Sequence, residues 1–187
     1  MNLSLEMYDF IKIIASVFLG MFGKSAYDYF VEYREIRRDK KFIVDYFKNA
    51  KNLFPVLKEN YQRILQVLPN IDNTIHEFKL FEGFNTEVLK SISFPRYYHI
   101  FGQKAATIYE IYNIVNSLKG ELPISIYSKH LESLKNIYSN PDIKTDENIH
   151  ELETNLVNLT EATIKMKLQE IELLEKRIDM ILQKKIN

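Results

Sequence analysis

The sequence predicts an all-α protein, an elongated helical bundle with a long N-terminal helix and a long C-terminal helix. Apolar residues recur at helical rather than alternating spacing along most of the 187 residues. Five Gly and five Pro leave few of the tight turns that a many-stranded sheet requires. Because 46% of the residues are hydrophobic, the chain can bury a core of its own.

The first predicted helix covers residues 5–52, a stretch that contains no proline and only two glycines, Gly20 and Gly23. At about 1.5 Å per residue it would extend on the order of 70 Å, which is more than a compact domain of this size needs. We therefore expect part of this helix to project or to be covered by a partner. The chain is divided accordingly into residues 1–52 and a bundle of residues 53–187.

Proline and glycine residues mark where the next predicted helices begin and end. Pro55 can occupy the first turn of a helix that ends near Leu68, because proline lacks the N–H that this turn leaves unpaired. A short helix over residues 72–82 would end at Gly83.

Asn85 is placed as the N-cap of a further helix that ends before Phe94. Phe84 and Leu89 have the spacing of a hydrophobic staple at its start.

Two helices follow, over residues 103–119 and from Pro123 to the Asn-Pro-Asp turn that begins at Asn140. We expect Gly120 to cap the first and the second to pair antiparallel with it. Residues of the first that share one face are Ile108, Ile111, Tyr112 and Val115. Residues of the second with 3-4 spacing are Ile124, Tyr127, Leu131, Leu134 and Tyr138.

The last predicted helix covers residues 145–185. Its apolar stripe slips between Met166 and Ile171, which favours a bundle helix over a strict coiled coil. The stripe consists of Ile149, Leu152, Leu156, Leu159, Thr163 and Met166, and then Ile171, Leu174, Ile178 and Ile181.

Several chemistries have no support in the composition. The chain has no Cys, which excludes disulfides and thiolate metal sites, and nothing in it requires an oxidising compartment. Its 25 basic and 25 acidic residues give no net charge, which argues against nucleic acid as a partner. The histidines at positions 76, 99, 130 and 150 lie on four segments without metal-ligand spacing. We expect no metal and no cofactor.

The most apolar stretch, Phe10 to Gly23, has three readings: a buried core helix, a helix in or across a membrane, and a surface for self-association. Acidic residues precede it and basic residues follow it, as expected when the C-terminal side is cytoplasmic. Ser16, Gly20 and Gly23 share one face, on which another helix could approach closely. The residues assigned to this surface are Phe10, Ile13, Ile14, Ser16, Val17, Phe18, Gly20, Met21 and Gly23.

A basic cluster and an aromatic stripe follow. The cluster consists of Arg34, Arg37, Arg38, Lys40 and Lys41, of which Arg34, Arg37, Arg38 and Lys41 are the candidate contacts for lipid phosphate. Interleaved carboxylates favour ordinary pairing on a solvated face. The aromatic residues have helical spacing, which predicts core packing; they are Tyr27, Tyr29, Phe30, Tyr33, Phe42, Tyr46 and Phe47.

Arg96 and His99 are the two candidate catalytic residues. A compact helical fold resembles the HEPN ribonucleases, whose motif places an arginine several residues before a histidine. Here the separation is only three residues, so the family spacing does not match. Under that resemblance His99 would act as acid or base and Arg96 would stabilise charge on a phosphate. The alternative is an aromatic cluster next to a loop.

The order of features, an apolar N-terminal helix, a charged helix and a body without catalytic motifs, resembles in layout small bacterial membrane-anchored helical proteins. Some proteins of this layout are accessory factors in phage defence, including the membrane partner of a CRISPR effector. We expect an intracellular protein at the inner face of the cytoplasmic membrane, non-enzymatic and oligomeric, acting by association. The alternatives are a soluble helical adaptor or inhibitor of a protein partner and a divergent HEPN-like ribonuclease.

Overall fold

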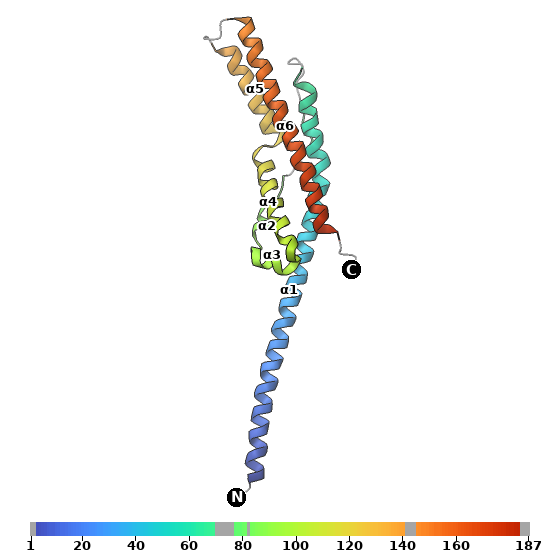
Figure 1. Cartoon of the computed structure of the whole chain (residues 1–187), viewed down its shortest axis with the longest axis vertical. Coiled ribbons are helices and arrows are strands. Elements are labelled where there is room, and N and C mark those ends of the chain that lie inside the picture. The colour runs from blue at the N-terminus through green and yellow to red at the C-terminus, as the bar shows by residue number, and fades with distance from the viewer. Residues whose placement is uncertain (1–2, 70–76, 82, 141–144, 184–187) are drawn as a thin grey trace. The chain divides into compact units, whose positions relative to one another are not determined.

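The computed structural model describes residues 3–69, 77–81, 83–140 and 145–183, and every regular element within these ranges is a helix, as predicted. The chain divides into two compact units, Met1–Phe42 and Ile43–Asn187. We call the second unit the helical body (Figure 1). The elements are α1 (Leu3–Val67), α2 (Glu87–Lys90), α3 (Phe94–Phe101), the 3₁₀ turn η1 (Gly102–Lys104), α4 (Ala105–Gly120), α5 (Pro123–Ser139) and α6 (Asp146–Leu182).

Helix α1 continues through Pro55, so the predicted end near residue 52 and the predicted new helix at Pro55 are wrong. The proline removes one backbone hydrogen bond, at a cost of about 3 kcal/mol, but it lies on the exposed side of the helix. On the opposite side one seven-residue pattern runs unbroken past it and is buried throughout. Its members are Ile43, Phe47, Ala50, Phe54, Leu57, Tyr61 and Ile64. Burial of about 1.5–3 kcal/mol per large side chain outweighs the lost hydrogen bond.

Helix α6 supplies the matching seam of the core. The members of this seam also stand three and four residues apart, and they are Thr160, Ile164, Lys167, Ile171, Leu174, Ile178 and Ile181. The predicted slip of the stripe is wrong, because the core position is taken by Lys167 whereas Met166 is exposed. Two ion pairs join this helix to α1, Lys51 Nζ to Asp179 Oδ1 at 2.5 Å and Lys58 Nζ to Glu175 Oε2 at 2.7 Å.

The buried Lys167 ammonium group has three partners. Its Nζ lies 2.8 Å from Glu121 Oε2, 3.2 Å from Glu170 Oε2 and 2.8 Å from Ser117 Oγ. Burial alone would lower the pKa of Lys167, but the hydrogen bonds and charges of the two carboxylates more than offset it, so the pKa is raised and the lysine is charged. The Tyr61 hydroxyl of α1 donates to the Glu121 carbonyl oxygen at 2.7 Å and joins the same region to the core.

Helices α4 and α5 follow one another along α6 (Figure 1), so the expected antiparallel pairing of α5 with α4 is wrong. Only Glu121 and Leu122 separate the two helices, and Leu122 is extended. The buried face of α5 is also turned from the predicted stripe, since Ile124 and Leu131 are exposed. The buried residues are Pro123, Ile126, Tyr127, His130 and Leu134.

The segment before α2 is not helical over residues 77–81, so this part of the predicted helix over residues 72–82 is wrong, and the rest lies outside the described residues. The buried Asn60 side chain explains the difference. Its Nδ2 donates to the Lys79 carbonyl at 2.9 Å and its Oδ1 accepts from the Lys79 N–H at 3.0 Å. Both backbone groups of Lys79 are thus bonded to a side chain instead of to a helix turn.

The N-cap of α2 is Thr86, one residue after the predicted Asn85, although the Asn85 side chain accepts a hydrogen bond from the Glu87 N–H at 3.2 Å. Helix α2 has only four residues, and the sequence did not predict α3. Pro95 is compatible with the first turn of α3, and Gly102 ends it with a φ of 58°. Gly120 is not a left-handed cap, because within the described residues only Gly83 and Gly102 have positive φ.

His130 is buried between α5 and α6. The Thr160 hydroxyl donates to the Leu156 carbonyl at 2.8 Å, so its oxygen is left to accept from the Nδ1–H of His130 at 2.9 Å. Burial lowers the pKa of His130, and the imidazole is therefore neutral in the folded chain at neutral pH.

This burial predicts a pH dependence of stability. An unfolded histidine titrates near about 6.5, above the lowered folded pKa, so the unfolded chain binds more protons in the interval between the two values. The free energy of unfolding is expected to fall as pH drops through about 6.5 and to level off below the folded pKa. Urea unfolding between pH 5 and 8 measures it. His130→Asn keeps a donor near Nδ1 without titrating, and an unchanged pH slope in this variant would contradict the assignment.

Candidate functional site: an exposed apolar helix

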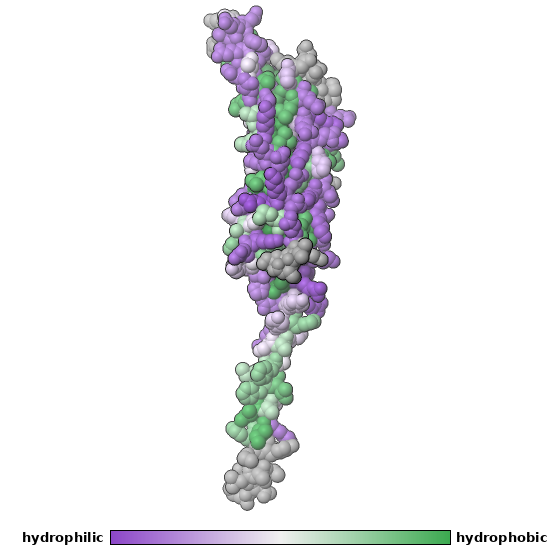
Figure 2. All heavy atoms as spheres, turned by 45° about the vertical axis from the view of Figure 1, so that its right-hand side comes forward, coloured by the Kyte–Doolittle hydropathy of each residue, from purple (hydrophilic) through white to green (hydrophobic). Residues whose placement is uncertain are grey.

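The residues Phe10 to Gly23, which we call the apolar segment, form part of α1 and expose large apolar side chains to solvent. Figure 2 shows the hydrophobic colour gathered there, whereas the visible surface of the helical body is mainly hydrophilic. The segment's exposed fractions lie between 40% and 72% for Phe10, Ile11, Ile13, Ile14, Val17, Phe18, Leu19, Met21 and Phe22. The helix is long and apolar enough to cross a membrane, and none of its most apolar 18-residue window is buried.

The apolar side chains surround most of the helix circumference. At about 100° per residue, the remaining stripe carries Lys12, Ser16, Gly20 and Gly23. The Ser16 hydroxyl donates to the Ile13 carbonyl oxygen of its own helix at 2.8 Å. A Cβ added at either glycine would meet no atom within 4 Å, so no packing inside the described chain accounts for the two glycines.

The aromatic residues that follow the apolar segment are also exposed. Tyr27, Tyr29, Phe30 and Tyr33 are each at least half exposed, so the prediction that they pack in the core is wrong. Nothing in the described residues buries this part of α1. Phe42 is exposed as well, and the prediction is confirmed only for Tyr46, which packs against the core, and for Phe47, which is fully buried. The sequence signal that could have separated the two groups is the seven-residue core pattern, which begins at Ile43.

The basic cluster comes next along α1, and its side chains are exposed: Arg34, Arg37, Arg38, Lys40 and Lys41. Arg34 lies over the ring of Phe30, with 5.9 Å between the guanidinium carbon and the ring centroid. Arg38 Nε is 3.5 Å from Asp39 Oδ1. Aliphatic, aromatic and basic side chains therefore follow one another in that order along a single helix.

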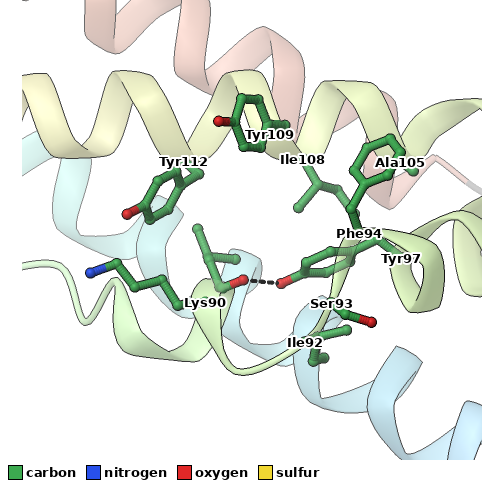
Figure 3. A pocket seen from close by; sticks show the side chains of 10 residues that line it. Lys90, Ile92, Ser93, Phe94, Tyr97, Ala105, Ile108, Tyr109 and Tyr112 are labelled. Carbon is green, nitrogen blue, oxygen red and sulfur yellow. Dashed lines mark hydrogen bonds between the residues drawn. The ribbon is translucent and has the colours of Figure 1, made fainter.

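A cavity of about 310 Å³ lies in the helical body, with α4 on one side and α2, α3 and the residues that link them on the other (Figure 3). Its wall is mostly aliphatic and aromatic, and the Tyr97 hydroxyl donates to the Leu89 carbonyl at 2.7 Å. Lys90 lies at its edge, 3.3 Å from a Glu87 oxygen. The hydrogen bond and charge of Glu87, with a contribution from Tyr112, raise the pKa of Lys90.

Arg96 and His99 lie outside this cavity, one turn apart on α3, which directly follows the non-helical residues 91–93. Arg96 is half-buried and His99 is exposed. Among the residues that the structure describes, no group of three His, Asp or Glu side chains is arranged to hold a metal ion.

Comparisons with known proteins return no matching protein family, no matching curated protein and no matching solved structure.

Proposed function

We propose that this chain is a non-enzymatic helical protein that is tethered to a membrane through the apolar segment and acts by association, as an accessory or effector factor. The exposure of that segment is the observation that carries the proposal. Burying each of its large apolar side chains would contribute about 1.5–3 kcal/mol. Soluble monomers rarely leave a contiguous apolar surface of this kind in water, so we expect a membrane or a protein partner to bury the segment.

A bilayer suits the distribution of the apolar side chains. They lie around most of the helix, whereas a groove on a protein partner would cover only one face. The backbone of α1 is hydrogen-bonded within the helix, and the Ser16 hydroxyl is satisfied in the same way, which lipid requires of any polar group.

The length of the segment is compatible with insertion. Fourteen residues rise about 21 Å, less than the roughly 30 Å of a hydrocarbon core. Lys12 and Lys24 stand near its two ends, where their long side chains can extend to the headgroups while their stems remain in the apolar layer.

The residues beyond Lys24 fit the layers of a membrane surface. Exposed tyrosines and Phe30 come first, and such rings favour the headgroup region. The basic cluster follows at the depth of the lipid phosphates. Basic residues concentrate on the cytoplasmic side of membrane helices, which favours the inner face of the cytoplasmic membrane as the location.

Flotation of the full-length protein with neutral phosphatidylcholine vesicles tests the proposal. The protein, diluted from detergent, is expected to rise with the vesicles and to remain bound in 1 M NaCl, because the apolar term does not depend on salt. Recovery as a detergent-free soluble monomer at the bottom of the gradient would refute the tether.

The basic cluster should add affinity only where the lipid is anionic. Changing Arg37, Arg38 and Lys41 together to Gln is expected to weaken binding to vesicles with anionic lipid by about 1 kcal/mol per charge, or on the order of a hundredfold in all. Binding to neutral vesicles should not change. The matched control changes Lys119, Lys129 and Lys135 of the helical body to Gln, and an equal loss in that variant would contradict a specific role of the cluster.

A further inference from the structure

The cavity beside α4 has the composition of a site for a small molecule. Leu89, Ile92 and Ile108 contribute aliphatic side chains to its wall. Phe94 and Tyr109 also line it and are 53% and 60% exposed, so the cavity opens to solvent beside them. A concave, mainly apolar wall with a few polar groups is typical of sites that bind small organic molecules.

One end of this cavity carries a positive charge and the other end is apolar. Figure 3 shows the Lys90 amino group and the Tyr112 hydroxyl at one end, and Phe94 and Ala105 at the other. The pKa of Lys90 is raised mainly by Glu87 and further by Tyr112, so the lysine is charged and the Tyr112 hydroxyl lies next to it. A ligand with an apolar body and one anionic group would match both ends.

Lys90 can bind an anion although it is already paired with Glu87. The two side chains are 52% and 75% exposed, and Nζ lies 3.3 Å from Glu87 Oε1. Ion pairs between groups as exposed as these are weak, because water screens the charges. The ammonium group also has three N–H donors, so contacts with Glu87 and Tyr112 leave a donor for a ligand.

The volume of the cavity limits the size of the apolar body. An apolar protein cavity of about 150 Å³ binds one benzene molecule. This cavity, at about 310 Å³, has roughly twice that volume and therefore room for two aromatic rings. Phe94, Tyr97 and Tyr109 line it, and aromatic rings pair favourably with one another in offset or edge-to-face contacts.

We infer that this cavity binds an aromatic carboxylate of two rings, with the carboxylate at Lys90 and Tyr112 and the rings extending towards Ala105. The Lys90 ammonium group and the Tyr112 hydroxyl donate hydrogen bonds to the carboxylate oxygens. The rings displace water from the aliphatic and aromatic wall. The site belongs to the helical body, so it goes beyond the associating role proposed above and does not depend on the apolar segment.

Equilibrium dialysis with biphenyl-4-carboxylate tests the inference. Full-length protein in a mild detergent is dialysed against the same micelles without protein, so that ligand taken up by the micelles is subtracted. Saturable binding of one molecule per chain is expected. Lys90→Gln should weaken this binding about tenfold, because it removes a charged hydrogen-bond donor. The matched control, Lys129→Gln, changes an exposed lysine of α5 and should bind as the wild type does.

Two further comparisons isolate the charge. Uncharged biphenyl-4-methanol should bind the wild type and the Lys90→Gln protein nearly equally. Glu87→Gln removes the anion that competes for Lys90 and should tighten binding of the carboxylate about threefold. Equal affinity of the Lys90→Gln and Lys129→Gln proteins for the carboxylate would overturn the inference, as would the absence of saturable binding by the wild type.

Filling the cavity gives an independent measurement. Ala105→Leu enlarges a buried side chain at the apolar end and should abolish binding of both compounds. Ala162→Leu, at an exposed position of α6, is the control and should bind normally. Undiminished binding by an Ala105→Leu protein with wild-type circular dichroism would refute this location, and if that variant does not fold, the Lys90 comparison decides. Vesicle flotation is a separate readout, so a failure of this site and a failure of the tether are distinguishable.

Discussion

Replacing both Val17 and Met21 by arginine is expected to release the protein from neutral vesicles. Each arginine in the centre of a membrane helix costs about 2.5–3.5 kcal/mol, so the pair should lower the partition coefficient by on the order of 10⁴- to 10⁵-fold. Both side chains are more than half exposed, and arginine has good helix propensity, so the fold of the chain should not change. Flotation with vesicles measures the loss, and circular dichroism checks the helix content.

The control places the same charges elsewhere. Asn113→Arg with Asn136→Arg adds two arginines to exposed positions of the helical body and should bind vesicles as the wild type does. If the Val17 and Met21 variant floats as well as this control, the apolar segment is not the tether.

The second large effect concerns the buried Lys167. Changing Glu121 and Glu170 together to Gln leaves the ammonium group buried without a counter-charge, and this should lower the free energy of unfolding by about 3 kcal/mol. Adding Lys167→Met to that variant should restore most of the loss, because methionine fills a similar volume with no charge. Urea unfolding in a mild detergent, followed by circular dichroism, gives both values.

Lys167→Met alone is expected to be within about 1 kcal/mol of wild type or more stable, since both glutamates keep access to water. Lys167→Ala removes the same charge but leaves a cavity, and should cost about 2–4 kcal/mol. A methionine variant as unstable as the alanine variant would show that the ion pairs, and not the volume of the side chain, hold this site.

The all-α class and the positions of α4, α5 and α6 could be predicted because periodicity and capping residues report on a single helix. The features that the sequence did not predict depend on contacts with other elements of the fold. The helix could continue through Pro55 because core contacts on both sides of it outweigh one hydrogen bond. Residues 77–81 are not helical because Asn60, 19 positions before Lys79, bonds both backbone groups of that residue. Lys167 was overlooked as a core residue because its burial depends on two carboxylates, Glu170 of its own helix and Glu121 between α4 and α5.

The candidate site, too, could be predicted from the sequence only in part. The sequence identified the apolar segment and the basic cluster by composition, but it could not distinguish a buried helix from an exposed one. Helical spacing also assigned Tyr27 and its neighbours to the core, since an interfacial aromatic belt and a packed stripe share the same period. Along α6 the predicted stripe mixed exposed Leu152, Leu159 and Met166 with residues of the buried seam, because spacing alone does not say which face is covered.

The two ion pairs between α1 and α6 join residues that are distant in the sequence: Lys58 and Glu175 are 117 positions apart, and Lys51 and Asp179 are 128 positions apart. This separation sets an order of events during synthesis. The core face of α1 has no α6 to pack against until more than 80 further residues have been translated, which takes roughly 4–16 s at bacterial or eukaryotic elongation rates. The apolar segment leaves the ribosome long before that. If the apolar segment is the proposed tether, nascent chains should therefore engage lipid while the rest is still unfolded, and the bundle should be completed at the membrane.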